Sequence, residues 1–211
     1  MNLNEYFDKI YCINLDERPD RWEQSLEEFE KVGIKNVERF SAIKHEKGAI
    51  GCRESHLKII EKSKNENLNN VLIFEDDVFF IENNLKHINK TLDDLNDIDW
   101  NLFYLGATVD PNVGYMEKFS DNLFKTNFAY TTHAYAVNSN IFDKILNEAQ
   151  YHPIIDVFYC RYIVPMNKSF IINPMVAIQR EGYSNIENLH ADYNWMIEFF
   201  DKIKLKSGID C

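Results

Sequence analysis

Short apolar runs alternate with amphipathic stretches along most of the chain. Continuous apolar runs rich in β-branched and aromatic residues predict strands at residues 9–15, 37–43, 71–74, 100–105, 128–137 and 169–179. Apolar residues spaced three or four positions apart predict helices at residues 20–32, 52–63, 85–95, 139–146 and 191–204. Residues 107–127 show neither pattern and predict a long loop. This alternation predicts one α/β domain over residues 1–211, with a mostly parallel central sheet flanked by helices.

Two local signals refine the helix boundaries. Asp20, followed three positions later by Glu23, predicts a capping box at the start of the first helix, and Gly33 predicts its end. Gly48 and Gly51 predict a loop that turns sharply into the next helix. Because the first amides of a helix carry unpaired N–H groups, the turn at Gly51 would favour an anion.

Composition and charge narrow the function classes. With 45% hydrophobic residues and only 7 Gly and 5 Pro, the 211-residue chain is neither disordered nor collagen-like. A net charge of −11 and scattered Lys residues disfavour nucleic acid as a partner. No apolar run reaches about 18 residues and the start is polar and acidic, so we expect no membrane span or secretory signal and predict a cytoplasmic protein. Four Cys without a CxxC pair favour buried thiols over disulfides or zinc.

Three consecutive carboxylates follow the most apolar predicted strand. Residues 71–74 lead directly into Glu75, Asp76 and Asp77, and strand alternation puts Glu75 and Asp77 on one face and Asp76 on the other. Adjacent like charges cost free energy unless a cation or hydrogen-bond donors compensate them. Oxygen ligands suit Mn²⁺ or Mg²⁺, which also hold substrate phosphates. The motif therefore predicts a metal site, and the alternative is an acidic turn that caps the next helix.

Two further segments carry polar groups at the start of a helix. After the first strand, Asn14, Arg18 and Arg21 surround a proline turn, where the guanidinium groups would clamp a diphosphate or a base edge. The alternative is that both Arg residues pair locally with neighbouring acidic residues. In the glycine-led segment after the second strand, Ser55 and His56 share a helix face with apolar residues and point inward. They are either ligand-binding groups or satisfied polar groups of the core.

In this order, three segments resemble glycosyltransferase family 25, which includes bacterial lipopolysaccharide and lipooligosaccharide galactosyltransferases and the collagen galactosyltransferase domain. They are residues 11–21 (YCINLDERPDR), 51–56 (GCRESH) and 74–78 (FEDDV). Looser agreement at residues 100–106, 134–135 and 179–186 extends the resemblance over roughly residues 9–187. It implies a GT-A-like fold and transfer of a hexose, galactose or glucose, from a UDP-sugar with inversion at the anomeric carbon.

The resemblance also implies roles for particular residues. Glu75, Asp76 and Asp77 would correspond to the metal-binding DxD motif and hold Mn²⁺ or Mg²⁺ against the leaving UDP. The donor would be held by Asn14, Arg18, Arg21, Gly51, Ser55, His56, Gln179 and Ser184. Asp156 is the candidate general base, with a helix-capping Asp as the alternative, and His190 is a further candidate for the metal shell. The acceptor would be a glycan, a lipid-linked saccharide or a hydroxylysine-type residue.

Three other function classes remain open from the sequence. A catalytically silent protein would bind nucleotide-sugars, or serve in assembly, without turnover. A glycoside hydrolase would use two carboxylates about 5–9 Å apart and no metal. A metal-dependent phosphotransferase would use the acidic cluster, although the sequence contains neither a P-loop nor a kinase-type Gly-rich loop. The chain is short for the resembled family, so we expect a minimal enzyme, a domain cut from a longer protein at its C-terminus, or a copy with a weakened acceptor site.

Overall fold

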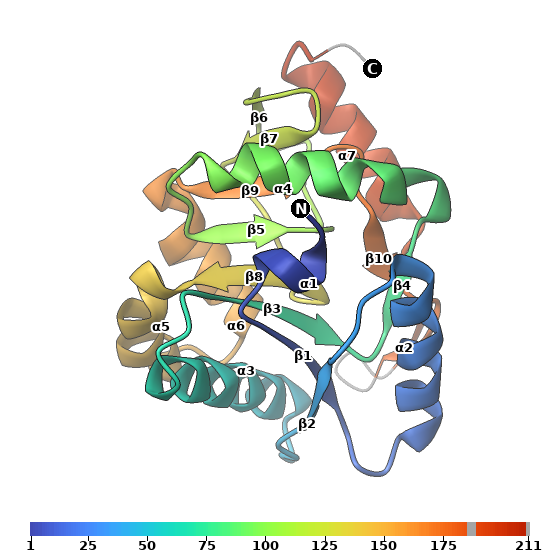
Figure 1. Cartoon of the computed structure of the whole chain (residues 1–211), viewed down its shortest axis with the longest axis vertical. Coiled ribbons are helices and arrows are strands. Elements are labelled where there is room, and N and C mark those ends of the chain that lie inside the picture. The colour runs from blue at the N-terminus through green and yellow to red at the C-terminus, as the bar shows by residue number, and fades with distance from the viewer. Residues whose placement is uncertain (185–188, 210–211) are drawn as a thin grey trace.

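Eight strands form the central sheet of the computed structural model, which describes residues 1–184 and 189–209 (Figure 1). They are β1 (Lys9–Asn14), β2 (Glu38–Ser41), β3 (Asn70–Glu75), β5 (Leu102–Tyr104), β6 (Met116–Lys118), β7 (Leu123–Thr126), β8 (Ala134–Asn138) and β9 (Ser169–Ile172). Their order across the sheet is β2-β1-β3-β8-β5-β9-β7-β6. Two small sheets pair β4 (Val78–Phe80) with β10 (Ala177–Gln179), and β11 (Gly182–Ser184) with β12 (Leu189–Ala191).

Most strands of the central sheet point in the same direction. β1 pairs in parallel with both β2 and β3, and β5 pairs in parallel with β9. β8 lies between β3 and β5 and runs antiparallel to both, so β3 and β5 share one direction. β7 likewise runs against its neighbours β9 and β6. Six of the eight strands therefore point one way, which confirms the predicted mostly parallel α/β sheet.

Helices cover both faces of this sheet (Figure 1). They are α1 (Leu3–Tyr6), α2 (Pro19–Val32), α3 (Gly48–Asn65), α4 (Ile88–Asn96), α5 (Phe142–Glu148), α6 (Ile155–Phe158) and α7 (Trp195–Lys206). Short 3-10 or π turns lie at Glu82–His87, Ser139–Ile141, Ala149–Tyr151, Tyr159–Ile163 and Val164–Met166. Within residues 1–184 and 189–209, the helices all fall short of the length and apolarity needed to cross a membrane. The cytoplasmic location stays a prediction.

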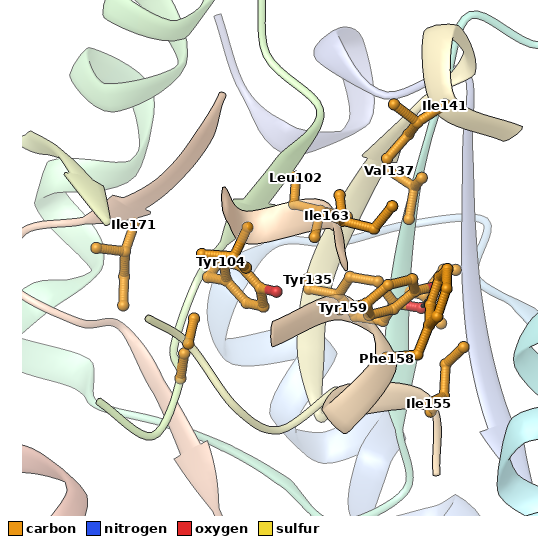
Figure 2. Close-up of a cluster of buried hydrophobic side chains, with 14 of the residues drawn as sticks. Leu102, Tyr104, Tyr135, Val137, Ile141, Ile155, Phe158, Tyr159, Ile163 and Ile171 are labelled. Carbon is orange, nitrogen blue, oxygen red and sulfur yellow. Dashed lines mark hydrogen bonds between the residues drawn. The ribbon is translucent and has the colours of Figure 1, made fainter. Parts of the chain in front are cut away.

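The sheet separates two apolar cores, as the alternation of side chains along β3 illustrates. Val71 and Ile73 belong to a cluster with residues of α3, α5, α6 and α7, whereas Leu72 and Phe74 belong to a second cluster with residues of α1, α2 and α4. All four are fully buried, as expected for a strand covered on both faces. Figure 2 shows part of the first cluster, where aromatic side chains of the sheet meet those at and after the end of α6.

The predicted start of the first helix is wrong, and its predicted end is confirmed. α2 begins at Pro19 with Arg18 as the N-cap, and Asp20 pairs with the Arg18 side chain at 2.7 Å instead of forming a capping box. Proline fits the first helical position because its missing N–H would be unpaired there in any case. Gly33 ends the helix in a left-handed conformation with φ of 69°.

The glycines before the predicted second helix lie inside it. α3 begins at Gly48, so Gly48 and Gly51 belong to the helix and not to a loop. A Cβ atom at residue 51 would lie 2.3 Å from the carbonyl oxygen of Ile43. Close backbone packing, and not a sharp turn, therefore explains the glycine at position 51.

Three strand predictions need correction. The predicted loop at residues 107–127 contains β6 and β7, which form an antiparallel pair at the far edge of the sheet. The strand predicted at residues 169–179 divides into β9 and β10 on either side of Pro174, which has no N–H to donate to a ladder. The strand predicted from residue 128 begins only at Ala134.

Candidate active site

The carboxyl ends of the parallel strands β2, β1 and β3 meet at one edge of the sheet, beside a cavity of about 290 Å³. The cavity is lined by Ile13, Leu15, Glu17, Arg21, residues 42–46, Gly48, Cys52, Ser55, His56, residues 75–77 and Gln179. Open α/β sheets bind ligands at this edge, outside the carboxyl ends of their strands. The acidic motif therefore lies in a cavity of the expected kind.

Glu75 is the last residue of β3, and its carboxylate is held from two sides. His56 Nε2 lies 3.2 Å from Glu75 Oε1, and the Thr132 hydroxyl donates to the same oxygen at 2.5 Å. Burial disfavours the ionised carboxyl, but these hydrogen bonds and the charge of His56 outweigh it and lower the pKa of Glu75. Glu75 is therefore an ionised carboxylate with a fixed orientation.

A buried chain of hydrogen bonds continues behind Glu75. The Tyr135 hydroxyl lies 2.9 Å from His56 Nδ1 and 3.2 Å from the Tyr159 hydroxyl. Because a carboxylate only accepts, His56 donates to Glu75 from Nε2, while its Nδ1 is hydrogen-bonded to the Tyr135 hydroxyl. His56 and both tyrosines are fully buried, and Figure 2 shows the tyrosines side by side. His56 thus orients Glu75 from the core, in agreement with its predicted inward position.

Asp76 follows the last residue of β3 and contacts different residues from Glu75. Its Oδ1 accepts from Arg21 at 3.0 Å and its Oδ2 accepts from Asn14 Nδ2 at 2.7 Å. Asn14 Nδ2 also donates to the Arg18 carbonyl, and Asn14 Oδ1 accepts from Arg39 Nε. Both polar atoms of the Asn14 side chain are therefore engaged in hydrogen bonds. Arg21 and Asn14 were both predicted to hold the donor, and in the structure both hold Asp76. Of these two, Arg21 lines the cavity and Asn14 does not.

Asp77 has one oxygen that the described protein leaves unpaired. Its Oδ2 accepts from Gln179 Nε2 at 3.1 Å, whereas Oδ1 is buried and has no hydrogen-bond partner among residues 1–184 and 189–209. Burial, followed by the charges of Glu75 and Asp76, raises the pKa of Asp77 to about 7. A buried carboxylate oxygen without a donor, next to two other carboxylates, is a position that a hard cation would stabilise. The residues present thus fit a divalent metal.

A second set of possible metal ligands lies at the same place and fits less well. One ligand atom each from Cys52, His56 and Glu75 lies within 4.8 Å of the others. Both ring nitrogens of His56 are already hydrogen-bonded, to Glu75 and Tyr135. Burial raises the pKa of the Cys52 thiol well above its ordinary value, which disfavours the thiolate, and hard cations such as Mn²⁺ and Mg²⁺ prefer oxygen ligands to sulfur. Asp77 is therefore the better candidate.

Three predicted donor-binding residues are placed differently from the expectation. Arg18 bonds to Asp20 through Nε and NH2, in the local pair considered as the alternative, and is not among the described lining residues. Gly51 donates its own N–H to the Lys47 carbonyl within α3, so its amide is not available to an anion. The Ser55 hydroxyl donates to the Gly51 carbonyl and accepts from the Ile43 N–H, so it fastens the segment after β2 to α3.

Two basic side chains at the cavity were missed. Lys44 and His45 follow β2 and line the cavity; Lys44 is ion-paired with Glu17, and His45 Nδ1 accepts from the Lys47 N–H at 2.9 Å. The available signal was their position directly after a parallel strand, which is where such sheets place ligand-binding residues.

Asp156 lies in a second cavity, of about 280 Å³, that shares Cys52, Glu75 and Gln179 with the first. It belongs to the first turn of α6, and its Oδ1 accepts from the Val157 N–H at 2.7 Å. Burial raises the pKa of Asp156, which makes its carboxylate a stronger base than an exposed aspartate. Ser184 and His190 lie in β11 and β12, but their side chains fall outside what the structure describes.

A family model for Glycosyltransferase family 25 (LPS biosynthesis protein) matches residues 46–153, just over half of the chain. The chain belongs to glycosyltransferase family 25. The matched region contains two of the three segments that carried the resemblance, at residues 51–56 and 74–78. The resemblance is therefore confirmed.

Curated members of family 25 are similar over a larger part of the chain. Human inactive glycosyltransferase 25 family member 3 is 30% identical over 161 residues, which cover 62% of this chain and 27% of that protein. Human procollagen galactosyltransferase 2 is 24% identical over 196 residues, which cover 71% of this chain and 30% of that protein. The chain thus spans less than a third of the length of these relatives.

Solved structures support the fold. A glycosyltransferase involved in the glycosylation of the major capsid of PBCV-1 matches with a TM-score of 0.55 and 12% identity, covering 85% of this chain and 95% of that chain. A197 from STIV matches with a TM-score of 0.50 and 11% identity, covering 88% of this chain and 94% of that chain. At these identities the likeness concerns the fold alone, and it confirms the predicted GT-A-like architecture.

Proposed function

We propose that this family 25 chain transfers a hexose, galactose or glucose, from a UDP-sugar to an acceptor hydroxyl, with inversion at the anomeric carbon. The observation that carries the proposal is the buried Oδ1 of Asp77, which has no hydrogen-bond partner in the described part of the chain and lies in a cavity at the carboxyl edge of the sheet. A divalent cation held there by Asp77, with Glu75 in support, would supply the positive charge that stabilises a leaving diphosphate.

The surrounding residues would keep these carboxylates in one geometry. Gln179 donates to Asp77 Oδ2, and His56 and Thr132 donate to Glu75 Oε1. Arg21 faces Asp76 at the same cavity and brings a positive charge beside it. Such preorganised groups need no rearrangement when the charge of the leaving group develops.

Asp156 is the proposed general base on the acceptor side. It lines the second cavity, which meets the first at Glu75 and Gln179, so an acceptor there would face a donor bound at the acidic turn. Asp156 would accept the proton of the acceptor hydroxyl as that oxygen attacks the anomeric carbon. One displacement by this route inverts the anomeric configuration.

A screen of UDP release tests this function. The chain is incubated with Mn²⁺ and each of a panel of UDP-sugars, first without an acceptor, where slow hydrolysis reports donor activation. UDP release that requires Mn²⁺ and is lost in Asp77→Asn would support the proposal, and release that survives a chelator would contradict it. The anomeric configuration of the product, read by NMR, tests inversion.

A catalytically silent nucleotide-sugar-binding protein is the second candidate function. It is favoured by the 30% identity to a human relative that is named as inactive. The same screen separates the two, because a silent protein would bind UDP in the presence of Mn²⁺ and release none from the sugar donors. Calorimetric titration with UDP supplies the binding measurement that the comparison needs.

A further inference from the structure

The second cavity has a lining of a different chemical character from the first. The first cavity is lined by five carboxylates, among them those of residues 75–77, whereas the second combines hydroxyl groups and aromatic rings with Asp156 and with Glu75, which it shares with the first. Its hydroxyl-bearing residues are Thr108, Thr131 and Thr132, its aromatic residues are Tyr130, Tyr193 and Trp195, and its own carboxylate is Asp156.

Two of the aromatic rings are held in place by further rings. Trp195, at the start of α7, packs edge-to-face on Phe199 with ring centroids 5.1 Å apart and an interplanar angle of 67°. Tyr130 packs edge-to-face on Phe128 at 5.0 Å and 81°. Such contacts fix the orientation of a ring before a ligand arrives. Trp195 remains 37% exposed, so part of its indole is open to a ligand.

The backbone beside these rings is strained. Thr131 has a φ of 75°, a left-handed conformation that a β-branched residue rarely adopts. Its neighbour Tyr130 exchanges backbone hydrogen bonds with Thr108, at 2.8 and 3.0 Å, which holds the segment against the sheet. Strain of this kind persists where the surrounding structure imposes it, and it is concentrated at ligand sites.

We propose that the second cavity is an acceptor site for a pyranose sugar, with the indole of Trp195 as the platform for the apolar face of the ring. The inference rests on the proposed function and specifies its substrate class: the acceptor is a glycan and not an amino acid side chain of a protein. A pyranose presents hydroxyls at its edge and an apolar face, which match the threonine hydroxyls and the aromatic rings of this lining. A cavity of about 280 Å³ suits one sugar ring.

The proposed transfer is a single displacement at the anomeric carbon of the donor. An acceptor hydroxyl oxygen forms the bond to the anomeric carbon of the donor while the bond from that carbon to the phosphate oxygen breaks. The electron pair of the broken bond leaves with UDP, and the hydroxyl proton goes to the Asp156 carboxylate. No oxidant or further reactant is needed.

Trp195→Ala tests the inference, with Tyr115→Ala as a matched control. Tyr115 is 54% exposed and lies outside the described lining of the second cavity. Binding of methyl hexopyranosides is measured by saturation-transfer NMR. Transfer from UDP-galactose or UDP-glucose with Mn²⁺ is measured with methyl hexopyranosides and with a hydroxylysine-containing collagen-like peptide. We expect glycoside binding by the unaltered protein, and a roughly fivefold to tenfold higher acceptor KM for Trp195→Ala.

The controls separate folding and donor effects from acceptor binding. UDP release without an acceptor is measured in Tyr115→Ala and should match that of the unaltered protein, and Trp195→Phe, which keeps a ring, should recover most of the acceptor affinity that Trp195→Ala loses. The inference is overturned if Trp195→Ala and Tyr115→Ala bind and use glycosides like the unaltered protein, or if only the peptide is glycosylated. If no UDP-sugar gives UDP release, the proposed function fails, and the NMR comparison of the same variants still decides the sugar site.

Discussion

Replacement of Asp77 by Asn should stabilise the metal-free protein in a pH-dependent way. In the folded protein the pKa of Asp77 is raised from 3.8 to about 7 by burial and by its acidic neighbours. A carboxyl whose pKa is raised on folding is protonated without penalty in the native state below about pH 4, and the fold loses stability as the pH rises from there through 7. Asn carries no charge at any of these pH values and still accepts from Gln179.

The magnitude follows from the two pKa values. At 1.36 kcal/mol for each pKa unit, the difference between 3.8 and about 7 corresponds to about 4 kcal/mol at high pH. Screening at this partly solvated turn reduces the effect. At about pH 8.5 we therefore expect the free energy of unfolding of Asp77→Asn to be about 2 kcal/mol higher than that of the unaltered protein. Near pH 5 the two proteins should differ by less than about 1 kcal/mol.

Urea unfolding at both pH values, with a chelator and again with Mn²⁺, measures these differences. Mn²⁺ should stabilise the unaltered protein at about pH 8.5, by about 2.7 kcal/mol at 100 times its Kd, and should leave Asp77→Asn nearly unchanged. Asp201→Asn, which removes one charge from an exposed position of α7, is the control and should show neither effect. If Asp77→Asn is destabilising at high pH without metal, or if its effect does not depend on pH, the description of the acidic turn is refuted.

Four further substitutions test other contacts at and near the site. Arg21→Ala should lower the free energy of unfolding by about 3 kcal/mol, because it leaves the largely buried Asp76 charge unpaired; Arg18→Ala, which breaks an exposed pair, should leave both urea unfolding and UDP affinity in calorimetry nearly unchanged. Tyr135→Phe should cost about 1–3 kcal/mol in urea unfolding, since His56 Nδ1 loses its partner, and it should lower kcat more than it raises KM by loosening Glu75. Gly51→Ala should cost about 1–3 kcal/mol in thermal unfolding, and an unchanged Tm would contradict the close packing of this glycine on the backbone.

Patterns within single segments predicted much of this fold. The apolar run at residues 71–74 gave β3 and the position of the acidic turn, because a strand buried on both faces is continuously apolar. Gly33 marked the end of α2 for the reason that only a residue tolerant of positive φ closes a helix in this way. The hairpin of β6 and β7 was missed because its strands are short and β7 is stabilised by pairing with β9, which lies more than 40 residues further along the chain.

The candidate site was predictable as a set of segments but not as a set of contacts. The order of the three motifs indicated the family, and the apolar run at residues 71–74 located the acidic turn. That Arg21 and Asn14 pair with Asp76, while Asp77 Oδ1 has no described partner, depends on the packing of α2 and β10 against the turn after β3. Side-chain pairing across distant segments leaves no pattern in a single sequence. Trp195 was missed for the same reason, since it reaches the second cavity from the start of α7.

The most direct test of the account is the location of Mn²⁺ in a crystal of the chain soaked with Mn²⁺ and UDP, read from anomalous scattering. The account predicts a manganese peak at coordination distance from Asp77 Oδ1, with the UDP diphosphate on its other side in the cavity beside β1 and β3. A peak bound elsewhere, or UDP in this cavity with no manganese at Asp77, would contradict it.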